Sequence, residues 1–190
     1  MGKSFFPRDE IVGAKGILVS FFCVSLQTMV LHIEDIKALA HRAQADERFC
    51  DGLFVTMHGD DWREARNAAW ALTHLPASCN GRIDDRRDEL TALAIATPDT
   101  SLRRLTLALL ERLEWGRDDV RTDLLDFCLT HMALRDEPYG VQALCMKLAY
   151  AQCRHYPELK GELRAALLLM PPAELGAGVK HTRGKILKML

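Results

Sequence analysis

The sequence predicts an all-α fold, an α-α superhelix of about four helical hairpins, and three observations support that prediction. One run of residues recurs along the chain at a nearly constant spacing. The apolar residues inside each copy recur as they would along one side of a helix. No stretch alternates between apolar and polar residues at period two, so no sheet is expected. A chain of 190 residues with 48% apolar content is long enough to bury a continuous core.

The recurring run begins at Ala65, returns at Leu102, and returns more loosely at Val141, so that its copies start 37 and 39 residues apart. Such a period is typical of a solenoid of stacked helix pairs, in which one pair cannot bury its apolar face alone. An acidic turn precedes each copy. We expect Asp61 and Asp99 in two of these turns to cap the helix that follows, because free backbone N–H groups and the helix dipole favour a carboxylate there.

The copies resemble the HEAT repeat, in which a turn aspartate precedes a second helix that reads roughly V-R-x-A-A-x-A-L. The resemblance covers about residues 46–170 and is weakest in the third copy, where Gln142 replaces the arginine. It implies about four HEAT-like hairpins whose second helices line a concave face. It does not imply any catalytic activity. It also implies that Arg66 and Arg103 are structural, as part of a ladder of Asp and Arg between neighbouring repeats. The alternative is that these arginines bind an anionic ligand.

The segments between the runs supply the partner helices of the pairs. We expect first helices over residues 47–57, 83–95, 120–131 and 159–170, and a lone second helix over 33–45 that caps the array. Pro157 suits a first helical turn, and Pro171-Pro172 breaks the chain before a last, basic helix over 173–190. The basic side chains of that last helix complement its own C-terminal dipole.

The expected concave surface consists of the third, sixth and tenth residues of each run. In chain order these are Asn67, Trp70, His74, Arg104, Leu107, Glu111, Ala143, Met146 and Tyr150. The sixth positions place Trp70, Leu107 and Met146 in register on the side away from the core. An exposed apolar row is typical of an interaction site, and Trp, Tyr and Met are common anchors for a helix or peptide. The alternative is that a neighbouring helix or the N-terminal extension covers the row.

This surface favours a non-catalytic scaffold that binds a protein or peptide partner, with no cofactor. The chain contains no HExxH, HxH or GxSxG spacing and no glycine-rich phosphate loop. Three histidines near helix ends or faces, His58, His74 and His131, are isolated from one another in the sequence. An isolated histidine is more often a surface or helix-end residue than a catalytic base, so enzyme activity is the less favoured interpretation.

A second hypothesis is a HEAT-like DNA glycosylase or DNA-binding protein of the alkylation-repair type. Its aromatic residues would come from Trp62, Trp70 and Trp115, and its acid from Asp61 or Glu111. The electrostatics argue against it, because DNA affinity depends on phosphate neutralisation by Lys and Arg. The net charge is −1, and among the expected concave positions only Arg104 could neutralise a phosphate. We therefore expect neither a nucleic-acid partner nor a membrane one.

The six cysteines form no CxxC pair and no Cys/His cluster at zinc spacing, so no metal site is expected. Several lie on apolar stripes, where a free thiol packs as a small hydrophobe. This usage suits a reducing compartment, and we expect a cytoplasmic protein.

The first 28 residues do not fit the repeat pattern, and we expect the repeat domain to span 29–190. The apolar run over 17–26 has the length of a signal peptide, but no small-x-small cleavage site follows it, and it is too short for a membrane span. Two interpretations are a start assigned too far upstream of Met29 and an added helix that covers the first repeat; export is a third. The partner, the pathway and the oligomeric state stay open.

Overall fold

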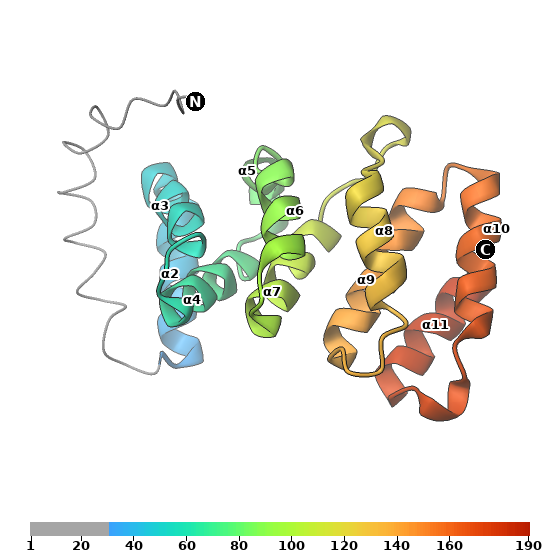
Figure 1. The fold of residues 1–190 in the computed structure, drawn as a ribbon. Coiled ribbons are helices and arrows are strands. Elements are labelled where there is room, and N and C mark those ends of the chain that lie inside the picture. The colour runs from blue at the N-terminus through green and yellow to red at the C-terminus, as the bar shows by residue number, and fades with distance from the viewer. Residues whose placement is uncertain (1–30) are drawn as a thin grey trace, which may run out of the picture. The chain divides into compact units, whose positions relative to one another are not determined.

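The computed structural model describes residues 31–190, and every regular element in that range is a helix (Figure 1). The expectations for residues 1–28 lie outside the described residues. The chain divides into two compact units, one that ends at His74 and one that runs from Leu75 to Leu190. Both consist of packed helices, as the sequence predicts.

The first unit contains α2 (Ile33–Ala45), α3 (Glu47–Met57) and α4 (Trp62–Thr73). The last two form a hairpin, and α2 packs against both of them, as expected for a capping helix. Asp46 separates α2 from α3, and its carboxylate accepts a hydrogen bond from the Phe49 backbone N–H at 3.1 Å. Asp61 caps α4 as predicted, by accepting from the backbone N–H groups of Arg63 at 2.8 Å and Glu64 at 3.1 Å.

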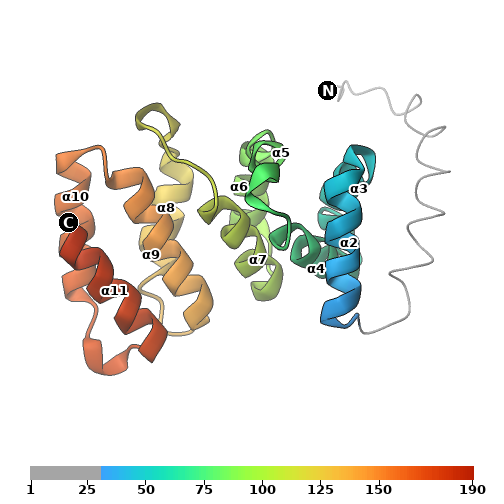
Figure 2. The same cartoon turned by 180° about the vertical axis from the view of Figure 1, so that it is seen from behind.

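The second unit repeats one arrangement of a first and a second helix. Its helices are α5 (Asn80–Asp84), α6 (Arg87–Ala96), α7 (Thr100–Glu111), α8 (Thr122–His131), α9 (Tyr139–Cys153), α10 (Pro157–Leu169) and α11 (Ala177–Met189). Short 3₁₀ turns lie at Ala77–Cys79, Arg117–Asp119 and Pro172–Glu174. The pairs are α6 with α7, α8 with α9, and α10 with α11. The second helices α7, α9 and α11 also pack on one another in sequence, and Figure 2 shows α9 and α11 side by side.

The ends of these helices follow the sequence signals, with one exception. Asp99 caps α7 by accepting from the Leu102 backbone N–H at 2.8 Å, and Pro157 is the first residue of α10. The helix expected over 83–95 is wrong as a single element, because it is divided into α5 and α6. Arg86 leaves helical geometry at φ −110° and ψ 15°, and the side chain of Arg87 then donates to the carbonyl of Glu114 at 2.8 Å.

Two arginines join the turns of successive repeats in the second unit. Arg112, which follows α7, donates to the carbonyls of Leu75 at 2.8 Å and Pro76 at 3.2 Å. Arg154, which follows α9, donates to the carbonyl of Trp115 at 2.9 Å. The bonds to Leu75 and Trp115 span 37 and 39 residues, the same spacings as the sequence repeat. A guanidinium with several donors suits these turn carbonyls, which have no partner inside a helix.

Candidate interaction surface on the second helices

The expected apolar row on the second helices is largely covered. Leu107 and Met146 are both 0% exposed, so the alternative in which neighbouring helices cover the row is the one observed. The reason is geometric. A second helix packs both on its own first helix and on the second helices beside it, as α7 does on α6 and α9. The side of a second helix that stays exposed to solvent is therefore narrow. The sixth position of a run lies about 60° around the helix from the third, which is enough to leave that side.

The third and tenth positions retain access to solvent. Arg104 and Glu111 on α7 are exposed, whereas Ala143 and Tyr150 on α9 are half-buried. Glu111 forms an ion pair with Lys147 of α9 at 3.0 Å. At the other end of α7 the aliphatic part of Arg104 lies over α9, since a Cβ added at Gly140 would be 3.0 Å from Arg104 Cδ.

The predicted residues of the first unit lie on α4. Asn67 and Trp70 are half-buried and His74 is exposed. The Nδ1 atom of His74 is 3.0 Å from the carbonyl oxygen of Trp70, and the two rings meet edge to face with centroids 6.1 Å apart. The structure therefore brings these two side chains together, while Asn67 lies on the same side of the helix one turn earlier.

Of the two repeat arginines, Arg103 makes a contact between neighbouring repeats of the kind that the HEAT resemblance implies, with a glutamate in place of an aspartate. Arg103 donates to the carbonyl of Thr97 at 2.6 Å, just beyond the end of α6, and forms an ion pair with Glu137 at 3.5 Å. Arg66 lies over the ring of Trp62, with its guanidinium carbon 4.3 Å from the ring centroid. Arg103 thus joins its own hairpin to the turn that precedes α9.

The same turn contains the buried Glu137, which pairs with the half-buried His131 in a contact that the sequence did not predict. The Nδ1 atom of His131, at the end of α8, is 2.6 Å from a carboxylate oxygen of Glu137. The imidazole also stacks on Phe127 with a centroid separation of 3.9 Å. A buried carboxylate needs such partners, so the pair accounts for an acidic residue inside this turn.

The residues considered for a glycosylase site have other contacts. Trp115 is 1% exposed, and its indole N–H donates to the carbonyl of Leu110 at 3.1 Å. Asp61 caps α4, and Glu111 pairs with Lys147. Trp62 is exposed, but Arg63 and Arg66 both lie over its ring. These four residues, like Trp70 beside His74, therefore have contacts within the protein and do not need a nucleotide to explain their positions.

A row of lysines is the main feature of the surface that sequence reasoning missed. Lys180, Lys185 and Lys188 of α11 are exposed, while Val179 and Ile186 face the interior. The sequence signal was visible as a basic C-terminus, which we attributed to the dipole of its own helix. That explanation suits Lys188 in the last turn. It does not suit Lys180, which lies in the first turn, where a cation is unfavourable.

A pocket of about 630 Å³ opens at the end of the hairpin where α9 begins. Apolar side chains from α8 and from the end of α10 form most of its wall, among them Met132, Leu169 and Met170. Tyr139, the first residue of α9, also lines it, and Leu169 is 83% exposed. The ion pair between Arg135 and Glu174 lies at the same pocket.

Within residues 31–190, Cys79, Cys128, Cys145 and Cys153 are free, buried thiols, and Cys50 is buried as well. A hydrogen bond with Cys145 and burial together raise the pKa of Cys128 well above its usual range. In the same part of the chain no group of His, Cys, Asp and Glu side chains is arranged to hold a metal ion. No helix between residues 31 and 190 is both long and apolar enough to cross a membrane.

Comparisons with known proteins agree with the arrangement of helix pairs. The search of curated proteins and the search of solved structures each found no match. The family model described as the HEAT repeat domain matches residues 25–190. Both the copies of the run and the paired helices lie inside that range, and the chain belongs to the HEAT-repeat family.

Proposed function

We propose that this chain is a non-catalytic HEAT-repeat scaffold that binds a protein or peptide partner on its second helices. The observation that carries the proposal is the free side of α7, α9 and α11. There Arg104, Glu111, Lys147 and Lys180 are exposed on three helices that pack side by side. Surfaces that extend across successive repeats are the usual binding sites of solenoid proteins.

One further observation supports a binding role. Two of the three histidines considered for catalysis have structural partners, since His131 pairs with Glu137 and His74 with the carbonyl of Trp70. As part of the same proposal we place the protein in the cytoplasm. The support is chemical, because Cys79, Cys128, Cys145 and Cys153 are free thiols, as expected in a reducing compartment.

A steric block on the second helices tests the proposal. A Cβ added at Gly184 of α11 or at Gly161 of α10 meets nothing within 4 Å, so a side chain can leave the backbone at both sites without a clash at its first atom. The wild-type chain is used to capture a partner from an extract of its source cell, and we expect Gly184→Trp to abolish this capture. Gly161→Trp makes the same change on a first helix and is the matched control, which should retain the partner. A partner that Gly184→Trp still captures at the wild-type level would place the binding site elsewhere.

A further inference from the structure

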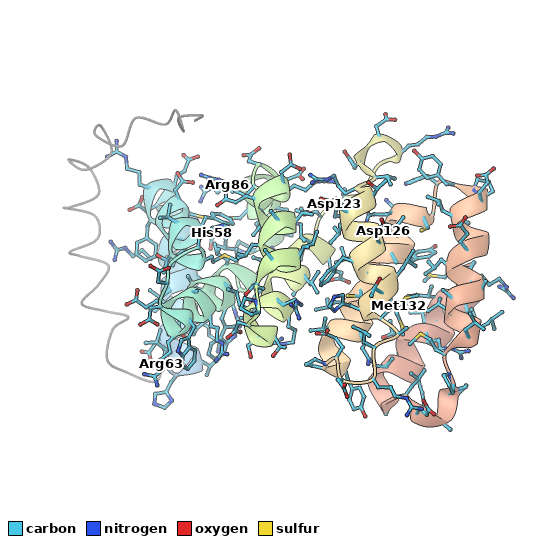
Figure 3. All side chains as sticks on the ribbon, in the orientation of Figure 1. His58, Arg63, Arg86, Asp123, Asp126 and Met132 are labelled. Carbon is cyan, nitrogen blue, oxygen red and sulfur yellow. The ribbon has the colours of Figure 1, made fainter. Side chains whose placement is uncertain are left out.

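The helices of the second unit separate charge between first and second helices. The second helices α7, α9 and α11 contain seven basic residues and one acidic residue. The first helices α6, α8 and α10 contain three basic residues and six acidic ones. Figure 3 labels two of these acids, Asp123 and Asp126, on α8. A chain with a net charge of −1 therefore carries a basic surface on one set of helices.

Repeat spacing places Lys180 and Lys188 of α11 in register with the free side of α9. Tyr139 and Gly176 lie at the starts of α9 and α11 and are in contact, because a Cβ at Gly176 would be 2.8 Å from the Tyr139 ring. They are 37 residues apart. Counting the same distance from Ala143 and Ala151 on α9 leads to Lys180 and Lys188 on α11. Both lysines thus continue the row that Arg104 and Lys147 begin.

Most of this positive charge is unpaired. Within residues 31–190, Arg104, Lys180, Lys185 and Lys188 form no ion pair, while Lys147 is neutralised by Glu111. Small residues lie on the same three helices as these basic residues, since Ala108, Ala143 and Gly184 are all half-buried. Small side chains of this kind allow the backbone of a bound segment to approach closely.

The apolar pocket adjoins the start of the same surface. Tyr139 lines the pocket, and the next residue, Gly140, is the one that Arg104 covers. The pocket and the contact of Arg104 thus meet at neighbouring residues at the start of α9. Exposed apolar surface next to a polar rim is typical of an anchor site for a bulky side chain.

We propose that the second-helix surface of α7, α9 and α11 binds an acidic peptide segment of a protein partner. The carboxylates of the segment pair with Arg104, Lys180, Lys185 and Lys188, and one bulky apolar residue enters the pocket beside Tyr139. This inference rests on the proposed scaffold function and specifies the chemistry of the partner.

A protein segment fits this surface better than a nucleic acid. The carboxylate of Glu111 lies within the basic row, 3.0 Å from Lys147. A phosphate backbone carries charge at every nucleotide, whereas a peptide can place an uncharged residue opposite this carboxylate. The pocket beside Tyr139 is walled mostly by apolar side chains, which suit a leucine or phenylalanine, and its Arg135 is already paired with Glu174. A peptide can combine both kinds of contact.

Fluorescence anisotropy on the full chain tests the inference. The probe is a short fluorescein-labelled peptide rich in glutamate with one central leucine, and the competitors are the same peptide with alanine in place of leucine and a short DNA duplex. We expect saturable binding that weakens as NaCl rises from about 50 mM to about 300 mM. The combined change Lys180→Glu, Lys185→Glu and Lys188→Glu should weaken binding about tenfold or more. Lys160→Glu on α10 is the control and should stay within about twofold.

Four results would overturn the inference: no saturable binding of the peptide by the wild-type chain, unchanged affinity in the triple variant, equal affinity for the alanine peptide, or tighter binding of the DNA duplex. The variant Gly184→Trp distinguishes a failure of the acidic-peptide inference from a failure of the scaffold proposal. A cellular partner that is lost from Gly184→Trp but retained by the triple lysine variant would show that the surface binds without recognising acidic charge. The scaffold function would then stand while the acidic partner would not.

Discussion

Replacing Leu107 by alanine measures how completely the second helices are covered. Leu107 is 0% exposed, and so is Leu109, two residues further along α7. Truncating a fully buried leucine costs about 2–5 kcal/mol, from lost burial and from the cavity that remains. We therefore expect Leu107→Ala and Leu109→Ala each to lower the free energy of unfolding by about 3 kcal/mol. With a denaturant slope of about 2 kcal/mol per molar urea, the unfolding midpoint would fall by about 1.5 M.

The assay is urea unfolding followed by far-ultraviolet circular dichroism, which reports the helices directly. Ala108→Gln is the control, because Ala108 is half-buried between the two leucines and glutamine is a good helix former. It should change the free energy of unfolding by no more than about 0.5 kcal/mol. If Leu107→Ala also stays within about 0.5 kcal/mol while Leu109→Ala does not, Leu107 is accessible and the apolar row belongs to the interaction surface after all.

Two further predictions concern the repeat turns and the thiols. Arg112→Ala should lower the free energy of unfolding by about 1.5–3 kcal/mol, because it leaves the carbonyls of Leu75 and Pro76 without their charged donor, and Arg112→Lys should not restore it. Urea unfolding of the three proteins measures this, and equal midpoints would contradict it. Burial, with a smaller contribution from the charge of Glu162, raises the pKa of Cys153 to about 11 from its ordinary 9.0. The native state then holds this proton more tightly than the unfolded state, so stability should fall as pH rises from about 9 to about 11, by at most about 1.4 kcal/mol per pH unit. Unfolding at several pH values tests this, and Cys153→Ala should show a smaller slope.

Local signals were enough to predict most helices and their ends. The carboxylates of Asp61 and Asp99 accept backbone N–H groups two or three residues away, so their capping depends on a few neighbouring residues. Pro157 begins α10 for an equally local reason, because its fixed φ suits a first turn. The apolar spacing inside each run likewise predicts which residues face the first helix.

The division between α5 and α6 was not predictable in that way. The apolar residues Ile83 and Leu90 keep helical spacing across the break, and both are buried. What distinguishes this segment is Arg87, whose partners at Glu114 and Trp115 lie 27 and 28 residues further along the chain. A contact that distant in sequence has no local signature.

The sequence by itself determined that this protein is a helical repeat, because period, caps and apolar spacing are short-range properties that recur in each copy. Only the tertiary structure decided which sides of the second helices stay free. Leu107 and Met146 are as apolar in sequence as an exposed anchor would be, but α7, α9 and α11 pack on one another and bury the flanks of each helix. Only a narrow row of residues, from Arg104 to Lys180, stays exposed to solvent. Long charged side chains can extend to solvent at the edge of a contact between helices. A leucine, in contrast, stabilises the fold by being removed from water.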